Sequence, residues 1–156
     1  MENKQSDAWE TPKWLFDELD SEFDFVIDLC ATRDNTKKLD FCEDYLDYVA
    51  SEQQYQCAFM NPPYSNPKPF IVKAWEDSKY HKIVILVPNT IKTCKYIDIL
   101  DENAGQGTFR KWKRGVEIRD LSRRTRFTHP HKQSSSPSFG CMLIVMDRGQ
   151  HEANSV

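Results

Sequence analysis

Glycine is scarce in this chain, and the glycine-rich loops that hold nucleotides in many enzymes are missing. Only 5 of 156 residues are glycine, which is about 3% against a usual value near 7%. The sequence contains neither G-x-G-x-x-G nor G-x-x-x-x-G-K-[S/T]. This argues against a standard dinucleotide-binding fold and against a P-loop enzyme. Any nucleotide-like ligand must be held by a different kind of turn.

Long apolar runs and paired cysteine motifs are missing too. No apolar run approaches the roughly 18 residues of a membrane helix, and the N-terminus is polar and acidic. We therefore expect neither a membrane span nor a signal peptide. The five cysteines are odd in number and form no C-x-x-C. Reduced thiols in a cytoplasmic protein explain them better than disulfides or zinc ligands.

Charge is divided unevenly along the chain, whose net charge is −3. Residues 1–60 carry 15 acidic and 5 basic residues, whereas residues 106–133 carry nine Lys and Arg against two acidic residues. A charge run alone is more often a solvated face. The aromatic residues Phe109, Trp112 and Phe127 lie among these bases, however, and they favour contact with nucleic acid, whose bases stack on aromatic rings.

Apolar patterning divides the chain into alternating strands and helices. Predicted strands cover 25–30, 39–42, 56–60, 82–87, 115–119 and 141–146, and predicted helices cover 11–22, 69–79 and 89–100. Thr11 and Pro12 are expected to open the first helix as its N-cap and first residue. The alternation predicts one α/β domain over residues 9–148, with a mostly parallel sheet, helices on both faces, and flexible tails at 1–8 and 149–156.

Two polar sets stand where predicted strands end, at residues 28–32 and 61–65. In open α/β sheets, ligands bind at the carboxyl ends of the strands. The first set includes Cys30 and Ala31, whose small side chains let the backbone approach a ligand. We expect a binding site that uses both sets.

The second set begins with Asn61-Pro62-Pro63-Tyr64. The two prolines stiffen the turn and remove two N–H donors, so the side-chain oxygen of Asn61 and the carbonyl of Pro62 are available as acceptors. Two fixed acceptors suit an exocyclic amine, which has two hydrogens, and Tyr64 offers a flat ring for stacking on a base. Asn-Pro-Pro alone can be a simple turn, but the preceding strand and the following tyrosine favour a binding site.

With these motifs the chain resembles the phage-type DNA N6-adenine methyltransferases, which depend on S-adenosylmethionine. The resemblance covers about residues 9–147. Its segments are Trp9-Glu10-Thr11-Pro12, Asp28-Leu29-Cys30-Ala31 with Asn35, Asn61-Pro62-Pro63-Tyr64-Ser65, Leu86-Val87-Pro88, Arg126-Phe127 and the strand after Ser136-Pro137. It implies a single Rossmann-like methyltransferase domain with an antiparallel C-terminal strand. Methyltransferases in general have glycines after the acidic residue of the first loop; this chain lacks them, as the phage-type family tends to.

The resemblance also implies roles for individual residues. Asn61, Pro62, Pro63 and Tyr64 would form the catalytic turn, which holds the amine of an adenine flipped out of duplex DNA. Asp44 is expected to contact the cofactor, with Asp40 as its rival. The full set expected to bind S-adenosylmethionine is Thr11, Pro12, Asp28, Cys30, Ala31, Asp44 and Asn61.

Contact with DNA is expected to come from the basic segment 106–133. Only 29 residues separate Ala31 from Asn61, which is too short for a separate recognition domain. The expected contacts are Arg110, Lys113, Arg114, Arg119, Arg123, Arg124, Arg126 and Phe127, although Phe127 is equally compatible with an ordinary core position. His129 and His131 have no further ligands beside them, so no metal is expected.

The resulting expectation is an adenine-specific DNA methyltransferase that acts on double-stranded DNA in the cytoplasm, of the host cell if the chain is phage-encoded. An RNA or protein-glutamine methyltransferase remains an alternative, because the basic segment does not separate RNA from DNA. A nucleic-acid-binding module without catalysis would explain residues 106–133 and leave Asn61-Pro62-Pro63-Tyr64 unexplained. The sequence leaves open whether the protein is a monomer or a homodimer.

Overall fold

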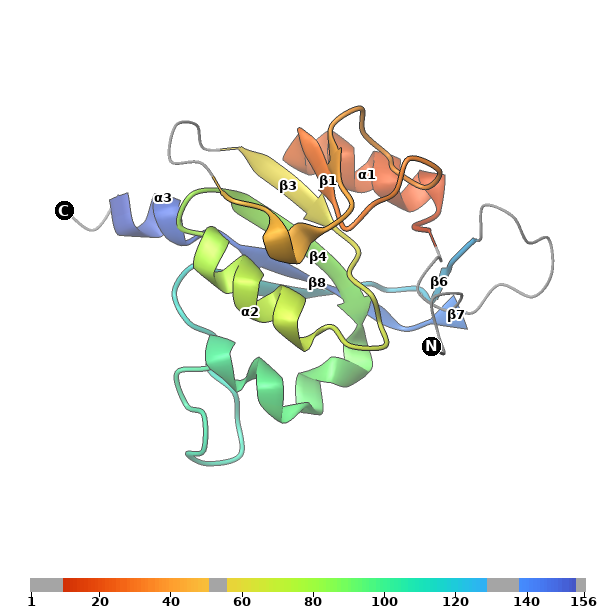
Figure 1. Cartoon of the computed structure of the whole chain (residues 1–156). Coiled ribbons are helices and arrows are strands. Elements are labelled where there is room, and N and C mark those ends of the chain that lie inside the picture. Colours follow the sequence, from red (N-terminus) through yellow and green to blue (C-terminus); the bar gives the residue numbers. More distant parts are fainter. Residues whose placement is uncertain (1–9, 51–55, 129–137, 154–156) are drawn as a thin grey trace.

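The computed structural model describes residues 10–50, 56–128 and 138–153. Its centre is a six-stranded sheet in the order β2-β1-β3-β4-β8-β5 (Figure 1). Strands β2, β1, β3 and β4 run parallel to one another, and β8 lies antiparallel between β4 and β5. This confirms the predicted mixed α/β fold with a mainly parallel sheet. The strands are β1 (Ile27–Leu29), β2 (Phe41–Cys42), β3 (Cys57–Met60), β4 (Lys82–Pro88), β5 (Val116–Asp120) and β8 (Cys141–Met146).

The central strands are apolar on both faces. Successive side chains of a strand point to opposite sides, and in β3 Ala58 and Met60 belong to one apolar cluster whereas Phe59 belongs to another. In β4, Ile85 and Leu86 divide in the same way between the two clusters. Both faces of the sheet must therefore be covered, as is typical of parallel sheets.

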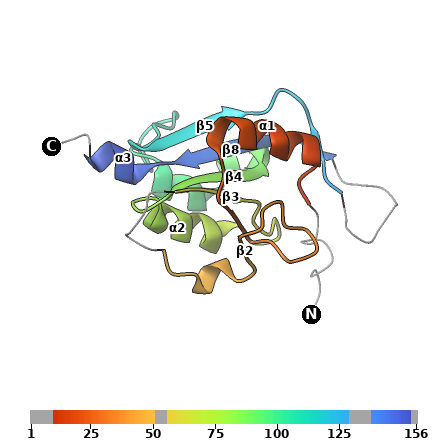
Figure 2. The same ribbon diagram turned by 90° about the horizontal axis from the view of Figure 1, so that it is seen from above.

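Helices cover the two faces as the sequence predicts. Helix α1 (Lys13–Phe23) packs on one face through Leu15, Phe16 and Leu19. Helix α2 (Lys68–Asp77) covers the other face, and Figure 2 shows the two helices on opposite sides of the sheet. In the part of the chain that the structure describes, no helix is both long enough and apolar enough to cross a membrane.

Residues 89–100 differ from the single helix predicted there. They form two 3-10 helices, η2 (Asn89–Thr93) and η3 (Lys95–Leu100), separated by Cys94, whose backbone is extended. The guanidinium of Arg110 donates hydrogen bonds to the carbonyl oxygens of Lys92, at 2.8 Å, and of Cys94, at 3.3 Å. A distant side chain thus takes carbonyls that a continuous helix would use for its own hydrogen bonds.

The C-terminal segment also differs from its prediction. A flexible tail was expected from residue 149, but α3 (Arg148–Ala153) forms a short helix there. The amide of Gly149 donates to the carbonyl of Ser78 at 3.1 Å, and the guanidinium of Arg148 lies 4.5 Å from the ring centre of Trp75. These contacts attach α3 to the end of α2. The expected N-terminal tail lies outside the described residues.

A small hairpin that the sequence did not predict lies at the carboxyl ends of the parallel strands. It pairs β6 (Thr125–Arg126) with β7 (Ser138–Phe139) in antiparallel register, at the right of Figure 1. Its two-residue strands are too short to give a recognisable alternation of apolar and polar side chains. The hairpin brings the C-terminal part of the basic segment to the end of the sheet where Met60 leads into Asn61.

Candidate active site

A polar pocket lies where β1 and β3 end, next to the start of α1. The space inside is about 20 Å³, which suits one water molecule. Five of the predicted cofactor residues meet here, although they come from three separate segments. The lining residues are Glu10, Thr11, Asp28, Cys30, Ala31, Asn35, Lys37, Phe59 and Asn61.

Asp28 is the buried carboxylate of the pocket, with 4% of its surface exposed. Its Oδ2 accepts a hydrogen bond from the backbone amide of Lys37 at 2.8 Å. Burial raises the pKa of Asp28 from 3.8 to about 6, and the amide of Lys37 offsets part of that rise. The pocket therefore holds an acid that changes charge close to neutral pH.

The turn after β1 uses a small residue where glycine would be expected. Cys30 has a φ of +60°, in the left-handed region that costs a non-glycine residue about 1–2 kcal/mol. The amide of Ala31 then donates to the carbonyl of Cys42 at 3.0 Å, which fixes the turn against β2. Burial raises the pKa of the Cys30 thiol, so this side chain is a neutral part of the wall.

Asn61 stands at the end of β3 with its side-chain oxygen unused. Its Oδ1 is buried and has no hydrogen-bond partner among the described residues. The hydroxyl of Thr11, across the same pocket, is in the same condition. Buried polar atoms are nearly always paired, and each exception calls for an explanation. Two such atoms in one pocket are the signature expected of groups that pair with a ligand.

Tyr64 is held inside an aromatic cluster. Its ring centre lies 5.5 Å from that of Phe127 and 6.0 Å from that of Phe139, both edge-to-face, and its hydroxyl donates to the carbonyl of Leu86 at 3.2 Å. Burial raises the pKa of Tyr64, so the hydroxyl stays protonated. Phe127 is fully buried. Its ring supports Tyr64 from inside the fold, which is the core position that the sequence also allowed, and the DNA contact of Phe127 stays a prediction.

Glu10 and Lys37 belong to the pocket although the sequence did not single them out as site residues. The ammonium of Lys37 lies 3.1 Å from Oε2 of Glu10. The backbone of Glu10 pairs with Thr128 just beyond β6. Glu10 could have been found, since it stands in the Trp9-Glu10-Thr11-Pro12 motif. Lys37 carries no sequence signal, because only the fold of the loop between β1 and β2 brings it here.

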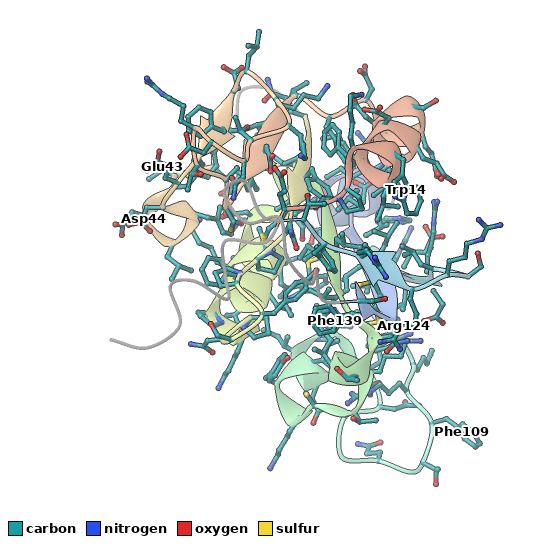
Figure 3. All side chains as sticks on the ribbon, turned by 90° about the vertical axis from the view of Figure 1, so that its right-hand side faces the viewer. Trp14, Glu43, Asp44, Phe109, Arg124 and Phe139 are labelled. Atoms are coloured by element: carbon teal, nitrogen blue, oxygen red, sulfur yellow. The ribbon has the colours of Figure 1, made fainter. Side chains whose placement is uncertain are left out.

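Two predicted cofactor residues do not line the pocket. Pro12 is buried at the N-cap position of α1, so the helix begins at Lys13 and the hydroxyl of Thr11 makes no capping bond. Asp44 is exposed and precedes η1 (Tyr45–Asp47), at the left edge of the view onto the carboxyl ends of β3 and β4 (Figure 3). Asp40, the other acidic residue considered for the cofactor contact, lies directly before β2, whereas Asp44 follows that strand.

Three of the predicted DNA contacts lie on the same side as the pocket. Arg123, Arg124 and Arg126 are exposed and belong to the turn before β6 and to β6 itself. The guanidinium of Arg124 donates to the carbonyl of Ser138 and so braces the hairpin. Figure 3 shows Arg124 next to Phe139 and well away from Phe109. The hairpin thus presents cations outward while Phe127 points inward.

The other predicted DNA contacts are engaged within the fold or lie far from the pocket. Arg110 pairs with Asp98 at 2.6 Å and with Asp101 at 3.1 Å, and Arg119 pairs with Glu22 and Glu117. Lys113 and Arg114 precede β5, whose first residue is in register with the start of β4. The structure does not bring these four residues to the pocket.

The described residues contain no group of three or more His, Cys, Asp or Glu side chains placed to hold a metal ion. His129 and His131, the pair that the sequence singled out, lie outside the described residues, as does the rest of 129–137.

Two comparisons with known proteins found matches to this chain. A family model described as DNA N-6-adenine-methyltransferase (Dam) matches residues 1–155. A relative named DNA N-6-adenine-methyltransferase, from Haemophilus phage HP1 (strain HP1c1), is 36% identical over 101 residues, which are 63% of this chain and 58% of the phage protein. The chain thus matches little more than half of that relative's length. No solved structure matches. The chain belongs to the DNA N-6-adenine-methyltransferase family.

Proposed function

We propose that this protein is a DNA adenine N6 methyltransferase that uses S-adenosylmethionine and acts on a flipped adenine in double-stranded DNA. The observation that carries the proposal is the buried Oδ1 of Asn61, which has no partner among the described residues. It opens the turn Asn61-Pro62-Pro63-Tyr64 at the carboxyl end of a central strand, where ligands bind in such sheets. In this reading the fold is a Rossmann-like methyltransferase domain.

The turn supplies acceptors for the amine of the base. Oδ1 of Asn61 and the carbonyl of Pro62 would each accept one hydrogen from N6 and hold its lone pair in line with the methyl group. Neither proline has an N–H, so no donor of the turn competes at these residues. The amine becomes positive as the methyl arrives, and the fixed dipoles of both acceptors stabilise that charge.

The pocket beside Asn61 is the proposed cofactor site. S-adenosylmethionine supplies a methyl group on a positive sulfur when bound. Asp28 and Glu10 offer carboxylates, Thr11 an unpaired hydroxyl and Lys37 an ammonium, so the donor set suits a ligand with both charges. The space of about 20 Å³ is far below the 300–1,000 Å³ typical of ligand sites. Binding therefore requires side chains of the lining to move outward.

Tyr64 would receive the flipped base. N6 cannot be reached inside the duplex, so the adenine must leave the stack. The edge-to-face contacts of Tyr64 with Phe127 and Phe139 fix its ring before a base arrives. A fixed ring reduces the entropy lost when the base stacks on it.

The DNA-contact surface that we propose is the β6–β7 hairpin with Arg123, Arg124 and Arg126. These cations are exposed at the end of the sheet where the pocket lies, and their contacts with phosphates would orient the duplex with respect to Asn61. Arg110 and Arg119 are less suited to this role because carboxylates already neutralise them.

Transfer of a tritiated methyl group from S-adenosylmethionine tests the proposal directly. Duplex DNA, single-stranded RNA and a glutamine-containing protein extract serve as alternative acceptors. We expect label in DNA, recovered as N6-methyladenine after hydrolysis. Label recovered in RNA or in protein would show that this molecule, and not DNA, is the substrate. Absence of transfer together with absence of cofactor binding in calorimetry would favour a non-catalytic nucleic-acid-binding module.

A further inference from the structure

An ion pair occupies the pocket that is proposed for the cofactor. The ammonium of Lys37 lies 3.1 Å from Oε2 of Glu10, and their side chains are only 18% and 21% exposed. Both residues line the same space of about 20 Å³ as Thr11, Asp28 and Asn61. Among the described lining residues, Lys37 is the one cation. Any anionic group that enters this pocket therefore has a single charged donor available to it.

The ion pair occupies the ammonium of Lys37, but the carboxylate of Glu10 does not depend on this ammonium as its only partner. The backbone of Glu10 is fixed by Thr128, because the amide of Glu10 donates to the carbonyl of Thr128 at 2.7 Å and the reverse bond measures 3.2 Å. The hydroxyl of Thr128 also donates to Oε1 of Glu10 at 3.2 Å. The carboxylate thus retains a partner outside the pair, and only side-chain rotation is needed to release Lys37.

The chemistry of the pocket favours one end of the proposed cofactor. An amino acid end carries an ammonium and a carboxylate, whereas a nucleoside carries no charge. Asp28 can accept from an ammonium, but the carboxylate needs a cationic donor, and charge-assisted hydrogen bonds are the strong ones. Lys37 fits this need, and its present partner is itself a carboxylate.

We propose that Lys37 binds the α-carboxylate of the cofactor's amino acid end, and that the carboxylate of Glu10 occupies this position in the ligand-free protein. The inference rests on the proposed function, because it assigns one end of the proposed cofactor to the pocket. The two carboxylates compete for one ammonium. Glu10 therefore lowers the affinity for the cofactor.

Two probes separate the amino acid end from the rest of the ligand. S-adenosylhomocysteine carries the nucleoside and the amino acid end, and 5′-methylthioadenosine carries the nucleoside alone. Calorimetric titration measures the dissociation constant of each probe for the wild-type chain, Lys37→Met, Glu10→Gln and a control, Lys38→Met. The ammonium of Lys38 pairs with Asp20 at 2.8 Å, and Lys38 does not line the pocket. Thermal unfolding checks that each variant folds; the backbone bond from Lys37 to Asp28 survives the substitution.

We expect Lys37→Met to raise the dissociation constant of S-adenosylhomocysteine about 10- to 100-fold, as for the loss of a hydrogen bond to a charged group. The dissociation constant of 5′-methylthioadenosine should stay within about twofold of its wild-type value. Glu10→Gln should lower the dissociation constant of S-adenosylhomocysteine about two- to fivefold, in line with the energy of a partly exposed ion pair. Lys38→Met should change neither.

Three results would overturn the inference. If Lys37→Met weakened the binding of both probes equally, Lys37 would have a structural role and would not contact the carboxylate. Unchanged binding of S-adenosylhomocysteine by Lys37→Met would remove its role altogether. Weaker binding by Glu10→Gln would show that Glu10 accepts from the cofactor's ammonium. If the wild-type chain binds neither probe, the proposed function fails first, and the inference fails with it.

Discussion

The hydroxyl of Tyr64 donates a hydrogen bond to the backbone carbonyl of Leu86, 3.2 Å away on the neighbouring strand. This bond ties the last residue of the Asn61 turn to the centre of β4. With Phe127 and Phe139 against its ring, Tyr64 is held both at its hydroxyl and by contacts with its ring. The turn that begins at Asn61 is therefore anchored to the sheet by the side-chain contacts of Tyr64.

Tyr64→Phe should lower the free energy of unfolding by about 1 kcal/mol, because one largely buried hydrogen bond is lost. It should reduce methyl transfer only mildly, since the stacking ring remains. Tyr64→Ala should weaken base capture strongly. Urea unfolding and single-turnover methylation distinguish the two effects. Equal loss of activity in both variants would point to the hydroxyl as the functional group.

Asn61→Ala should reduce methyl transfer by about 100-fold or more, as for the removal of one preorganised polar group from an active site. Its folding stability should stay the same or rise, because the buried Oδ1 makes no bond that the fold would lose. Turnover and thermal unfolding are measured on the same preparation. Asn66→Ala, at an exposed position just beyond the turn, is the matched control. Near-normal turnover in Asn61→Ala would contradict the assignment.

Phe127→Ala should lower the free energy of unfolding by about 3–5 kcal/mol, because a fully buried ring leaves a cavity. Phe109→Ala should change it by less than about 0.5 kcal/mol, since 83% of the surface of that residue is exposed. The milder Phe127→Leu keeps the chain folded for DNA-binding measurements. Its non-specific DNA affinity should equal that of the wild type; a clear loss would support a direct DNA contact for Phe127.

Arg123→Ala and Arg126→Ala should each weaken DNA binding at all sequences and reduce the slope of log affinity against log salt by about 1. Arg114→Ala should leave the slope unchanged, because Arg114 lies at the opposite end of the strands. Fluorescence anisotropy over a salt series measures both quantities. A reduced slope in Arg114→Ala would place DNA on the far edge of the sheet.

Asp28 should make folding stability depend on pH between about 4 and 6. Its pKa is about 6 in the folded protein against an ordinary 3.8, so the folded state binds more protons in this range. Stability contributed by the protonated acid is therefore lost as pH rises, by roughly 3 kcal/mol in total. Asp28→Asn should remove this dependence and gain stability at pH 7. Denaturant unfolding from pH 4 to 7 tests it; parallel curves for both proteins would contradict the assignment.

Much of the fold follows from local patterns. The strands of residues 82–87 and 141–146 are continuous apolar runs, and the structure confirms both as β4 and β8. Residues 89–100 were harder to predict. Ile91, Ile97 and Leu100 face the core there, which resembles a helical period, but the carbonyls of Lys92 and Cys94 bind Arg110. The spacing of apolar residues indicates which side of a segment is buried, but it does not indicate which backbone hydrogen bonds the segment forms.

The candidate site divides in the same way. The sequence by itself determined the chemical groups, because local patterning places Asp28, Cys30, Ala31 and Asn61 at strand ends and the family resemblance adds Thr11 to them. Only the tertiary structure decided that Lys37 faces Glu10, that Phe127 is buried against Tyr64, and that Arg110 is neutralised by Asp98 and Asp101. The physical reason is that each of these pairings joins two different segments whose residues are not linked by the repeat of a single helix or strand. Their geometry depends on how the sheet, the loops and the hairpin pack together, and no local pattern carries that information.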